Sequence, residues 1–313
     1  MALVQRHAGE RTQAVGLALA AEQMSFTAVR SVRAGPFPST LRAALEVAAE
    51  VGADWTVMID GDVLLLPSAI PRLVRLASDH PPSTASVAAC CLDRFTGTVR
   101  VVGVRCYRTS VIEQALGLEG WESALRPETE LLTMLGQVGH ETYLSALLVG
   151  IHDFEQYYRD LYRTAVVHGV KSRRKAEPFV RKWSGREADP ETTIMLSGVE
   201  AGLRRSGVEL DAVPLHEEAK AVLAAAGLAE REELGDSIRL DVWAVIDPKH
   251  RWLTRPTNVA RLFPGFARRM SYKDGQPRRA RKVRLAWRHR SHLRSIAPLR
   301  PLIRLQASSC SSM

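Results

Sequence analysis

Two aspartates separated by one glycine stand directly after a short apolar run. The run is Trp55-Thr56-Val57-Met58-Ile59, and Asp60-Gly61-Asp62 follows it. A buried strand of a parallel sheet carries its carboxyl end to the rim where α/β proteins bind ligands. Two carboxylates at this spacing suit a divalent cation, Mg²⁺ or Mn²⁺, held together with a diphosphate. The alternative is an ordinary turn in which both aspartates cap the next helix.

A histidine opens a second polar motif, His152-Asp153-Phe154-Glu155-Gln156. The spacing of Asp153 and Gln156 predicts a capping box for a helix that follows at once. Apolar and aromatic side chains then recur at helical spacing, at Phe154, Tyr157, Tyr158, Leu161, Tyr162 and Ala165. An imidazole just before a helix can complete a metal site, so His152 is a candidate third ligand. Spacing alone favours the alternative, an ordinary histidine in front of a helix.

Paired acids open a third predicted helix in Pro127-Glu128-Thr129-Glu130-Leu131. Acidic side chains in a first helical turn stabilise it by interacting with the helix dipole. The functional interpretation makes Glu128 a general base that removes the proton of a hydroxyl group. The residues themselves leave both interpretations open.

The elements that would position these residues alternate between helix and strand. We expect the following elements in chain order: a helix over 11–23, a strand over 27–32, a helix from Ser39 to Gly52, the strand over 55–59, a helix over 64–77, and a hairpin of strands 86–90 and 99–104 around Thr96-Gly97. Beyond Glu128 the pattern predicts mainly helix. This alternation indicates an α/β fold with a mostly parallel sheet flanked by helices.

The stretch from Phe37 to Leu66 resembles a known family. Its helix, Gly-Ala-Asp-Trp, apolar strand and Asp-Gly-Asp are similar to the donor half of GT-A glycosyltransferases, particularly the family-2-like group. The resemblance implies a Rossmann-like GT-A domain over about residues 1–245. It also implies that Asp60 and Asp62 bind the metal and the nucleotide.

Two further segments carry the resemblance. The Pro-Glu-Thr-Glu-Leu motif followed by Gly139 is similar to the Glu-Asp signature of inverting members, with Glu128 where their catalytic aspartate stands. His152 resembles the downstream metal histidine of many such enzymes. The chain departs from the family in having Glu for Asp at the base position, and in a short first strand, Ala2 to Gln5.

The activity that the resemblance implies is metal-dependent transfer of a sugar from a nucleotide-sugar donor to a hydroxyl acceptor. The expected acceptor is a glycan or a lipid-linked molecule, in the synthesis of a bacterial cell-surface glycan. One alternative is a phosphatase of the haloacid-dehalogenase type, with Asp60 as nucleophile and Lys220, Asp236 and Asp241 as later motifs. A second is a non-catalytic interaction protein that keeps the fold, which the short first strand favours.

Charge is distributed unevenly over the 313 residues, whose formal net charge is +9. From Arg255 to Arg304 there are fifteen Lys or Arg and one acid, so the chain before this segment is net acidic. We expect a basic, partly helical or disordered tail over 246–313 that meets an anionic membrane surface, with Trp287 near the interface. The alternative is a solvated tail without a partner. Nucleic acid is not expected, because aromatic residues are few.

Cysteine usage and hydropathy bear on the compartment. Cys90, Cys91, Cys106 and Cys310 show no metal-type spacing, and an adjacent pair is a poor disulfide candidate, so we expect a reducing compartment. No run is long enough to cross a bilayer as a helix. Residues 14–21 have the order of a short signal peptide, but they also fit the amphipathic helix that we favour. We therefore expect a cytoplasmic protein, attached peripherally at the inner membrane face by its tail.

Overall fold

A computed structural model describes residues 1–95, 98–171, 180, 189–207 and 211–234. Several expectations fall outside this part of the chain: the domain boundary at 245, the basic tail over 246–313, Asp236, Asp241, Cys310 and the Thr96-Gly97 turn. The helix over 11–23, the strand over 27–32 and the strand ending at Asp60 are all present, with the bounds given below.

One sheet of seven strands organises the described residues, in the spatial order β2-β1-β3-β6-β5-β7-β4. The strands are β1 (Ala2–Arg6), β2 (Ala28–Val32), β3 (Trp55–Asp60), β4 (Val63–Leu65), β5 (Thr84–Asp93), β6 (Thr98–Arg108) and β7 (Glu141–His152). Parallel pairs are β1 with β2, β1 with β3, and β5 with β7. Strand β6 runs antiparallel to β3 and β5, and β4 runs antiparallel to β7.

The α/β fold class is therefore confirmed, and the pairing is more mixed than expected. The pairs of β2 with β1, β1 with β3 and β5 with β7 are parallel as expected, whereas the other three pairs are antiparallel. The predicted hairpin accounts for the antiparallel pair of β5 and β6, because strands joined by a short turn must run antiparallel. The antiparallel pair of β4 and β7 was not expected, because both segments were predicted to be helical.

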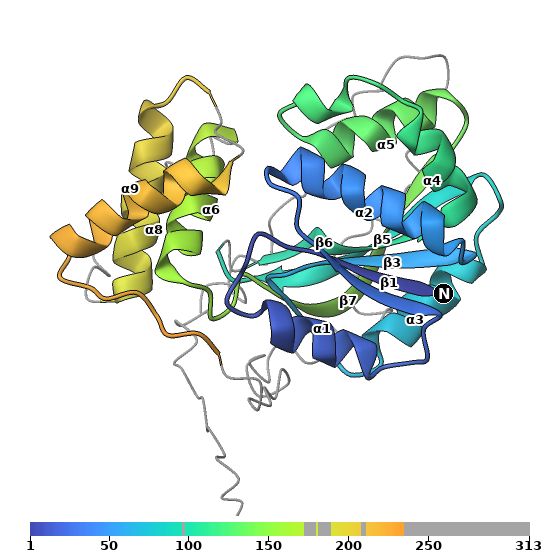
Figure 1. Cartoon of the computed structure of the whole chain (residues 1–313), viewed down its shortest axis with the longest axis horizontal. Helices are drawn as coiled ribbons and strands as arrows, with labels where there is room; N and C mark the ends of the chain where they lie inside the picture. Colours follow the sequence, from blue (N-terminus) through green and yellow to red (C-terminus); the bar gives the residue numbers. More distant parts are fainter. Residues whose placement is uncertain (96–97, 172–179, 181–188, 208–210, 235–313) are drawn as a thin grey trace, which may run out of the picture.

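Helices cover both faces of the sheet (Figure 1). One face carries α2 (Phe37–Val51), α4 (Thr109–Leu116), the 3₁₀ turn η1 (Trp121–Ser123) and α5 (Pro127–Gln137), and the other carries α1 (Gln13–Ala21) and α3 (Ala69–Ser78). A third group, α6 (Tyr158–Lys171), α8 (Pro190–Arg204) and α9 (Ala212–Ala225), packs together at one end of the sheet.

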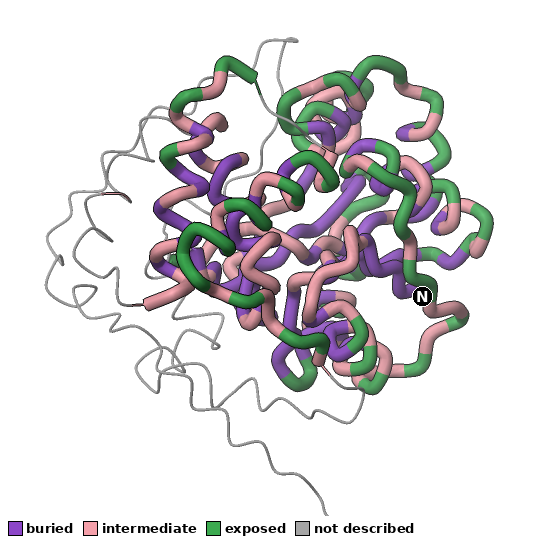
Figure 2. Tube along the Cα trace, turned by 60° about the vertical axis from the view of Figure 1, so that its left-hand side comes forward, coloured by how far each residue is buried: buried purple, intermediate pink, exposed green. Residues whose placement is uncertain are grey.

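Successive side chains of β3 pack into two different apolar clusters, one on each face of the sheet. Val57 and Ile59 belong to the apolar cluster with α1 and α3, whereas Met58 belongs to the cluster with α2 and α4. Successive side chains of a strand point to opposite faces, so a strand covered on both faces must be apolar throughout. Figure 2 shows the buried residues gathered in the interior of the trace, with exposed residues around the outside.

Two expected helices are wrong. Leu64 and Leu65 form β4, which pairs with Gly150 and Ile151 of β7, and the helix expected over 64–77 begins only at Ala69. Residues 141–152, expected to be mainly helical, form the longest strand among the described residues. Both errors have one cause: periodicity does not separate a buried strand from a buried helix in a short apolar run.

Helix α2 shows what local chemistry does predict. It begins at Phe37 rather than after Ser39, because Pro38 in its first turn needs no hydrogen-bond partner for its nitrogen. It ends as expected at Gly52, whose φ of 63° lies in the left-handed region that glycine favours.

No described helix combines the length and the apolar character that crossing a bilayer requires. Cys90, Cys91 and Cys106 are free and buried, and burial raises the pKa of all three thiols.

Candidate active site

Strand pairing brings the predicted metal ligands to one edge of the sheet. Arg6 and Asp60 are paired at the carboxyl ends of the parallel strands β1 and β3. Strand β7 ends at His152, which pairs with Val63 on one side and with Asp93 on the other. The ends of four strands therefore meet around the turn that carries Asp60 and Asp62.

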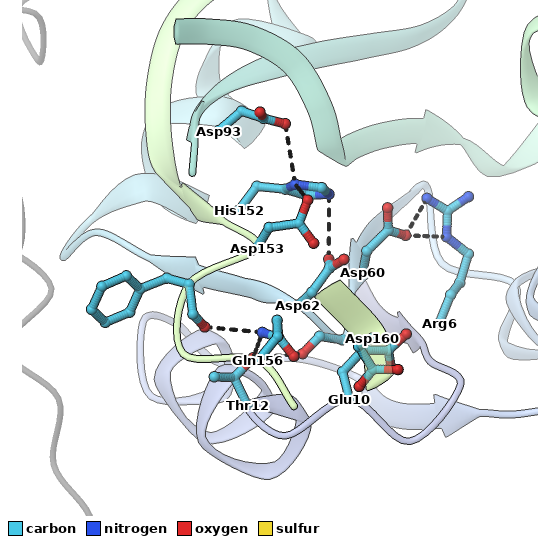
Figure 3. Close-up of polar contacts among 12 residues, drawn as sticks. Arg6, Glu10, Thr12, Asp60, Asp62, Asp93, His152, Asp153, Gln156 and Asp160 are labelled. Carbon is cyan, nitrogen blue, oxygen red and sulfur yellow. Dashed lines mark hydrogen bonds and ion pairs between the residues drawn. The ribbon is translucent and has the colours of Figure 1, made fainter. Parts of the chain in front are cut away.

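Asp60, Asp62 and His152 form a cluster whose ligand atoms all lie within 4.8 Å of one another (Figure 3). The imidazole Nε2 of His152 lies 3.5 Å from Asp62 Oδ1. That oxygen is buried and has no hydrogen-bond partner among the described residues. An unsatisfied buried carboxylate oxygen is costly unless something binds it, so the donor set fits a divalent cation. The imidazole favours Mn²⁺ over Mg²⁺ within that set.

Glu128 lies apart from this cluster and is linked to it by Arg6. The Arg6 guanidinium donates from Nε (2.9 Å) and Nη2 (2.6 Å) to Asp60 Oδ1, and from Nη1 to Glu128 Oε1 at 2.7 Å. The Tyr107 hydroxyl donates to the same Glu128 oxygen at 2.7 Å. Arg6 is only 3% exposed, so this chain of ion pairs is largely shielded from water.

The surroundings of the site shift the pKa values of its acids in different directions. Burial raises the pKa of Asp60 and of Asp62, although Arg6 and His152 respectively oppose the rise. Glu128 behaves in the opposite way: burial would raise its pKa, but Arg6 and Arg105 outweigh it and lower the pKa to about 2. The pKa of His152 is raised, because Asp153 and Asp62 outweigh its burial. For Asp60 and Asp62, burial therefore outweighs the positive charge of Arg6 and His152, and the pKa of each carboxyl stays above its ordinary value.

A cleft opens beside this turn, with about 560 Å³ of empty space that is partly open to solvent. Its walls include Arg6, Asp60 and Asp62 from the strand ends, Phe37 and Thr40 from α2, and Arg163 from α6. The Nη2 atom of Arg163 lies 3.4 Å from Glu10 Oε1, which adds a second partly exposed charge pair to the wall.

Glycines allow the backbone to approach closely around the cluster. A Cβ on Gly61 would lie 2.6 Å from Glu10 Oε2 and 2.8 Å from His7 Cβ. Gly103 of β6 has a φ of 72°, and a Cβ there would lie 2.5 Å from Val63 Cγ2 and 3.1 Å from His152 Cδ2. Any side chain at Gly103 would therefore push against the strand and the imidazole that form the site.

Gly103→Ala should lower the free energy of unfolding by about 2–5 kcal/mol, because left-handed strain costs about 1–2 kcal/mol and overpacking about 1–3 kcal/mol. Gly120→Ala is the matched control, since Gly120 also has a positive φ (91°) but a Cβ on it would meet no atom within 4 Å. Urea unfolding should show about 1–2 kcal/mol for the control, which keeps only the strain. Equal losses for the two variants would mean that Gly103 is not tightly packed.

The capping box expected at Asp153 and Gln156 is wrong. Helix α6 begins at Tyr158, and Gln156 Nε2 donates instead to Thr12 Oγ1 and to the Phe154 carbonyl. The amide nitrogens of Tyr158 and Arg159 are capped from a distance by the Glu230 carboxylate. His152 is therefore the last residue of a strand, which holds it more rigidly than a loop before a helix would.

The sequence interpretation missed Arg6, Asp93 and Tyr107. Arg6 and Asp93 are the last residues of β1 and β5, and each follows a largely apolar run, which is the same signal that singled out Asp60. Tyr107 had no such signal, because its position opposite Glu128 depends on the antiparallel pairing of β6.

The described residues bear on both alternative interpretations. Lys220 is 68% exposed on α9 and pairs with Glu217, whereas the cation that contacts Asp60 is Arg6. The first strand reaches Arg6, is buried throughout and is paired on both sides. The argument for a non-catalytic protein from a short first strand therefore no longer holds.

Comparisons with known proteins show a likeness in structure but none in sequence. No family model and no curated protein matches the sequence. The structure is similar to a mannosyltransferase from Pyrobaculum calidifontis, solved in complex with GDP-Man and Mn²⁺. The two share 14% sequence identity with a TM-score of 0.37, over 84% of this chain and 85% of that one.

Proposed function

We propose that this chain is a metal-dependent glycosyltransferase that moves a sugar from a nucleotide-sugar donor to a hydroxyl acceptor. The observation that carries the proposal is the cluster of Asp60, Asp62 and His152, with ligand atoms within 4.8 Å, beside a cleft that is partly open to solvent. The sequence around Asp60-Gly61-Asp62 supports it through its resemblance to GT-A donor sites.

In this proposal Asp60, Asp62 and His152 hold Mn²⁺ or Mg²⁺. A cation bound there supplies neutralisation of the charge that develops on a leaving nucleoside diphosphate. Arg6 holds the Asp60 carboxylate in place by two hydrogen bonds to one oxygen, so that the carboxylate need not reorganise when the donor binds. Arg163 lines the same cleft and can contact a phosphate or a sugar hydroxyl.

Glu128 is the general base in this proposal. Arg6 and Tyr107 both donate to Oε1, so Oε2 is the oxygen that would take the proton of the acceptor hydroxyl. The ion pairs keep the carboxylate ionised, as a base must be, and they also make it less basic. A base whose pKa is lowered to about 2 contributes less than one near neutral pH, so its effect should lie toward the low end of the usual range.

The acceptor we propose is a glycan or a lipid-linked molecule of the cell surface. An anionic membrane surface, reached through the basic tail, is the proposed second partner. Both follow from the sequence resemblance and from the charge of the chain beyond residue 254.

Incubation with Mn²⁺ and a panel of nucleotide sugars should release a nucleoside diphosphate from at least one donor. EDTA should abolish the release and added Mn²⁺ should restore it, because the donor diphosphate is bound through the metal. The reaction is followed by a coupled nucleoside-diphosphate assay, with and without cell-envelope glycan as acceptor. Absence of release and of metal-dependent binding over the whole panel would refute the proposal. An aspartyl-phosphate at Asp60 would identify a phosphatase instead.

A further inference from the structure

The imidazole of His152 lies between carboxylates on both of its nitrogen sides (Figure 3). On one side Nε2 lies 3.5 Å from Asp62 Oδ1. On the other side Nδ1 lies 3.0 Å from Asp153 Oδ2 and 3.4 Å from Asp93 Oδ2. A ring with acids on both sides can present only one nitrogen to a cation while the other is held by a hydrogen bond.

The two sides differ in their access to the cleft. The side chains of Asp60 and Asp62 are 24% and 14% exposed and line the cleft. The side chains of Asp93 and Asp153 are 0% and 3% exposed. A cation that arrives from solvent and must keep a position open for a substrate therefore meets the Nε2 side.

The Nδ1 side is buried, and in this orientation of the ring Nδ1 and Asp153 Oδ2 lie 3.0 Å apart without a hydrogen bond. Asp93 is paired with His152 across β5 and β7, and its Oδ2 also accepts a hydrogen bond from Arg100 Nη1 at 2.9 Å. A cation on this side would have to compete with Arg100 for the same oxygen. The second cluster with metal-ligand spacing, Asp93 with His152 and Asp153, is thus better suited to orienting the ring than to holding an ion.

Asp153 has a backbone conformation that non-glycine residues adopt only occasionally. Its φ of 59° lies in the left-handed region. The Asp153 amide donates to the Asp62 carbonyl at 3.1 Å, which ties the two residues together. This conformation turns the Asp153 carboxylate back onto the imidazole of its neighbour, where it contacts Nδ1.

We propose that Asp153, supported by Asp93, is a positioning residue that accepts the Nδ1 proton of His152 and directs Nε2 at the metal position between Asp60 and Asp62. This inference rests on the proposed metal site and adds the residues that orient its histidine. A metal-bound histidine commonly donates its other ring nitrogen to a carboxylate, and loss of that partner typically lowers metal affinity about 10–100-fold.

The test measures Mn²⁺ affinity by electron paramagnetic resonance of the free ion, with no nucleotide present. Asp153→Asn should weaken Mn²⁺ binding by about 10–100-fold, and Asp93→Asn should weaken it less because Asp93 lies farther from Nδ1. Asp62→Asn should weaken binding more than either, since it removes a ligand. Glu155→Gln is the matched control, because Glu155 lies two residues along the same loop and pairs with Arg11 instead.

A second readout reports the ring directly. In ¹H–¹⁵N spectra of the Mg²⁺-loaded protein, His152 should carry its proton on Nδ1, with the signal assigned by its loss in His152→Gln. A proton on Nε2 would overturn the inference, because the metal would then be on the Asp93 side. Asp153→Asn should weaken this preference for the Nδ1 proton while circular dichroism stays unchanged. If Asp153→Asn does not fold, Asp93→Asn and the wild-type spectrum decide the question alone.

The outcomes separate this inference from the proposed function. If His152→Gln weakens Mn²⁺ binding but Asp153→Asn and Asp93→Asn do not, the positioning role is wrong and the metal site stands. If Asp62→Asn binds Mn²⁺ as tightly as wild type, the metal site itself is refuted. If Asp153→Asn abolishes binding as completely as Asp62→Asn, Asp153 is a ligand and the positioning role is again wrong.

Discussion

Asp62→Asn should abolish metal-dependent nucleotide binding and leave the metal-free protein at least as stable as wild type. Asp62 Oδ1 accepts no hydrogen bond from the described residues, and its ion pair among them is the 3.5 Å contact with His152 Nε2. Burial raises its pKa, so the ionised form costs stability near pH 7. An acid whose folded pKa is raised stabilises the fold only at low pH, and Asn removes that cost at neutral pH.

Calorimetric titration of the protein with Mn²⁺ and nucleotide sugars measures the binding, and thermal unfolding of the metal-free protein measures the stability. Asp79→Asn, at an exposed position after α3, is the control for loss of one negative charge. Unchanged Mn²⁺-dependent binding in Asp62→Asn would refute the donor site. A large loss of stability without metal would show that the carboxylate serves the fold.

A substitution at Asp62 separates loss of metal binding from loss of stability better than one at Asp60 does. Removing the Asp60 carboxylate would leave Arg6, only 3% exposed, with an unpaired part of its charge. Breaking a buried ion pair by removing one partner costs about 3–5 kcal/mol. Loss of binding in Asp60→Ala would therefore mix a change in the site with partial unfolding, which Asp62→Asn avoids.

Glu128→Gln should lower turnover by about 10²–10⁴-fold and leave donor affinity nearly unchanged. The amide keeps the shape of the side chain but cannot take a proton from an acceptor hydroxyl. Donor affinity is spared because, among the described residues, Glu128 is linked to the Asp60 cluster through the hydrogen bonds of Arg6. The low pKa of Glu128 sets the expected loss nearer to 10² than to 10⁴.

The same variant should lose stability in a pH-dependent way. The pKa of Glu128 is lowered from 4.5 to about 2, so its charge stabilises the fold above its ordinary pKa. That contribution, about 3 kcal/mol for a shift of this size, fades as pH falls from about 4.5 through about 2. Glu128→Gln should thus be less stable than wild type at pH 7, and the two should converge toward pH 3.

Steady-state kinetics on folded protein and urea unfolding at pH 7 and pH 3 separate the two effects. Glu130→Gln is the matched control, because Glu130 occupies the same first turn of α5. A variant that loses stability but keeps its turnover would restrict Glu128 to holding Arg6, and the base would have to be sought elsewhere. A stability difference that is the same at both pH values would refute the ion-pair explanation.

The sequence by itself determined the features whose causes lie within a few residues. The apolar run at 55–59 followed by Asp60-Gly61-Asp62 predicted a buried strand with two carboxylates at its end, and β3 has those properties. The end of α2 at Gly52 was equally local, because only the left-handed backbone of that residue was required. The α/β class followed from the order of such elements.

Only the tertiary structure decided how distant segments meet. Arg6 joins Asp60 and Glu128 across 54 and 122 residues of sequence, and the contact exists because β1 and β3 pair in parallel register. His152 was chosen as a ligand for a position before a helix, yet it reaches the cluster as the end of a buried strand. Periodicity in an apolar run is compatible with strand or helix, and strand register is set by packing over the whole sheet. The candidate ligands were thus readable from sequence, whereas the groups that orient and neutralise them were not.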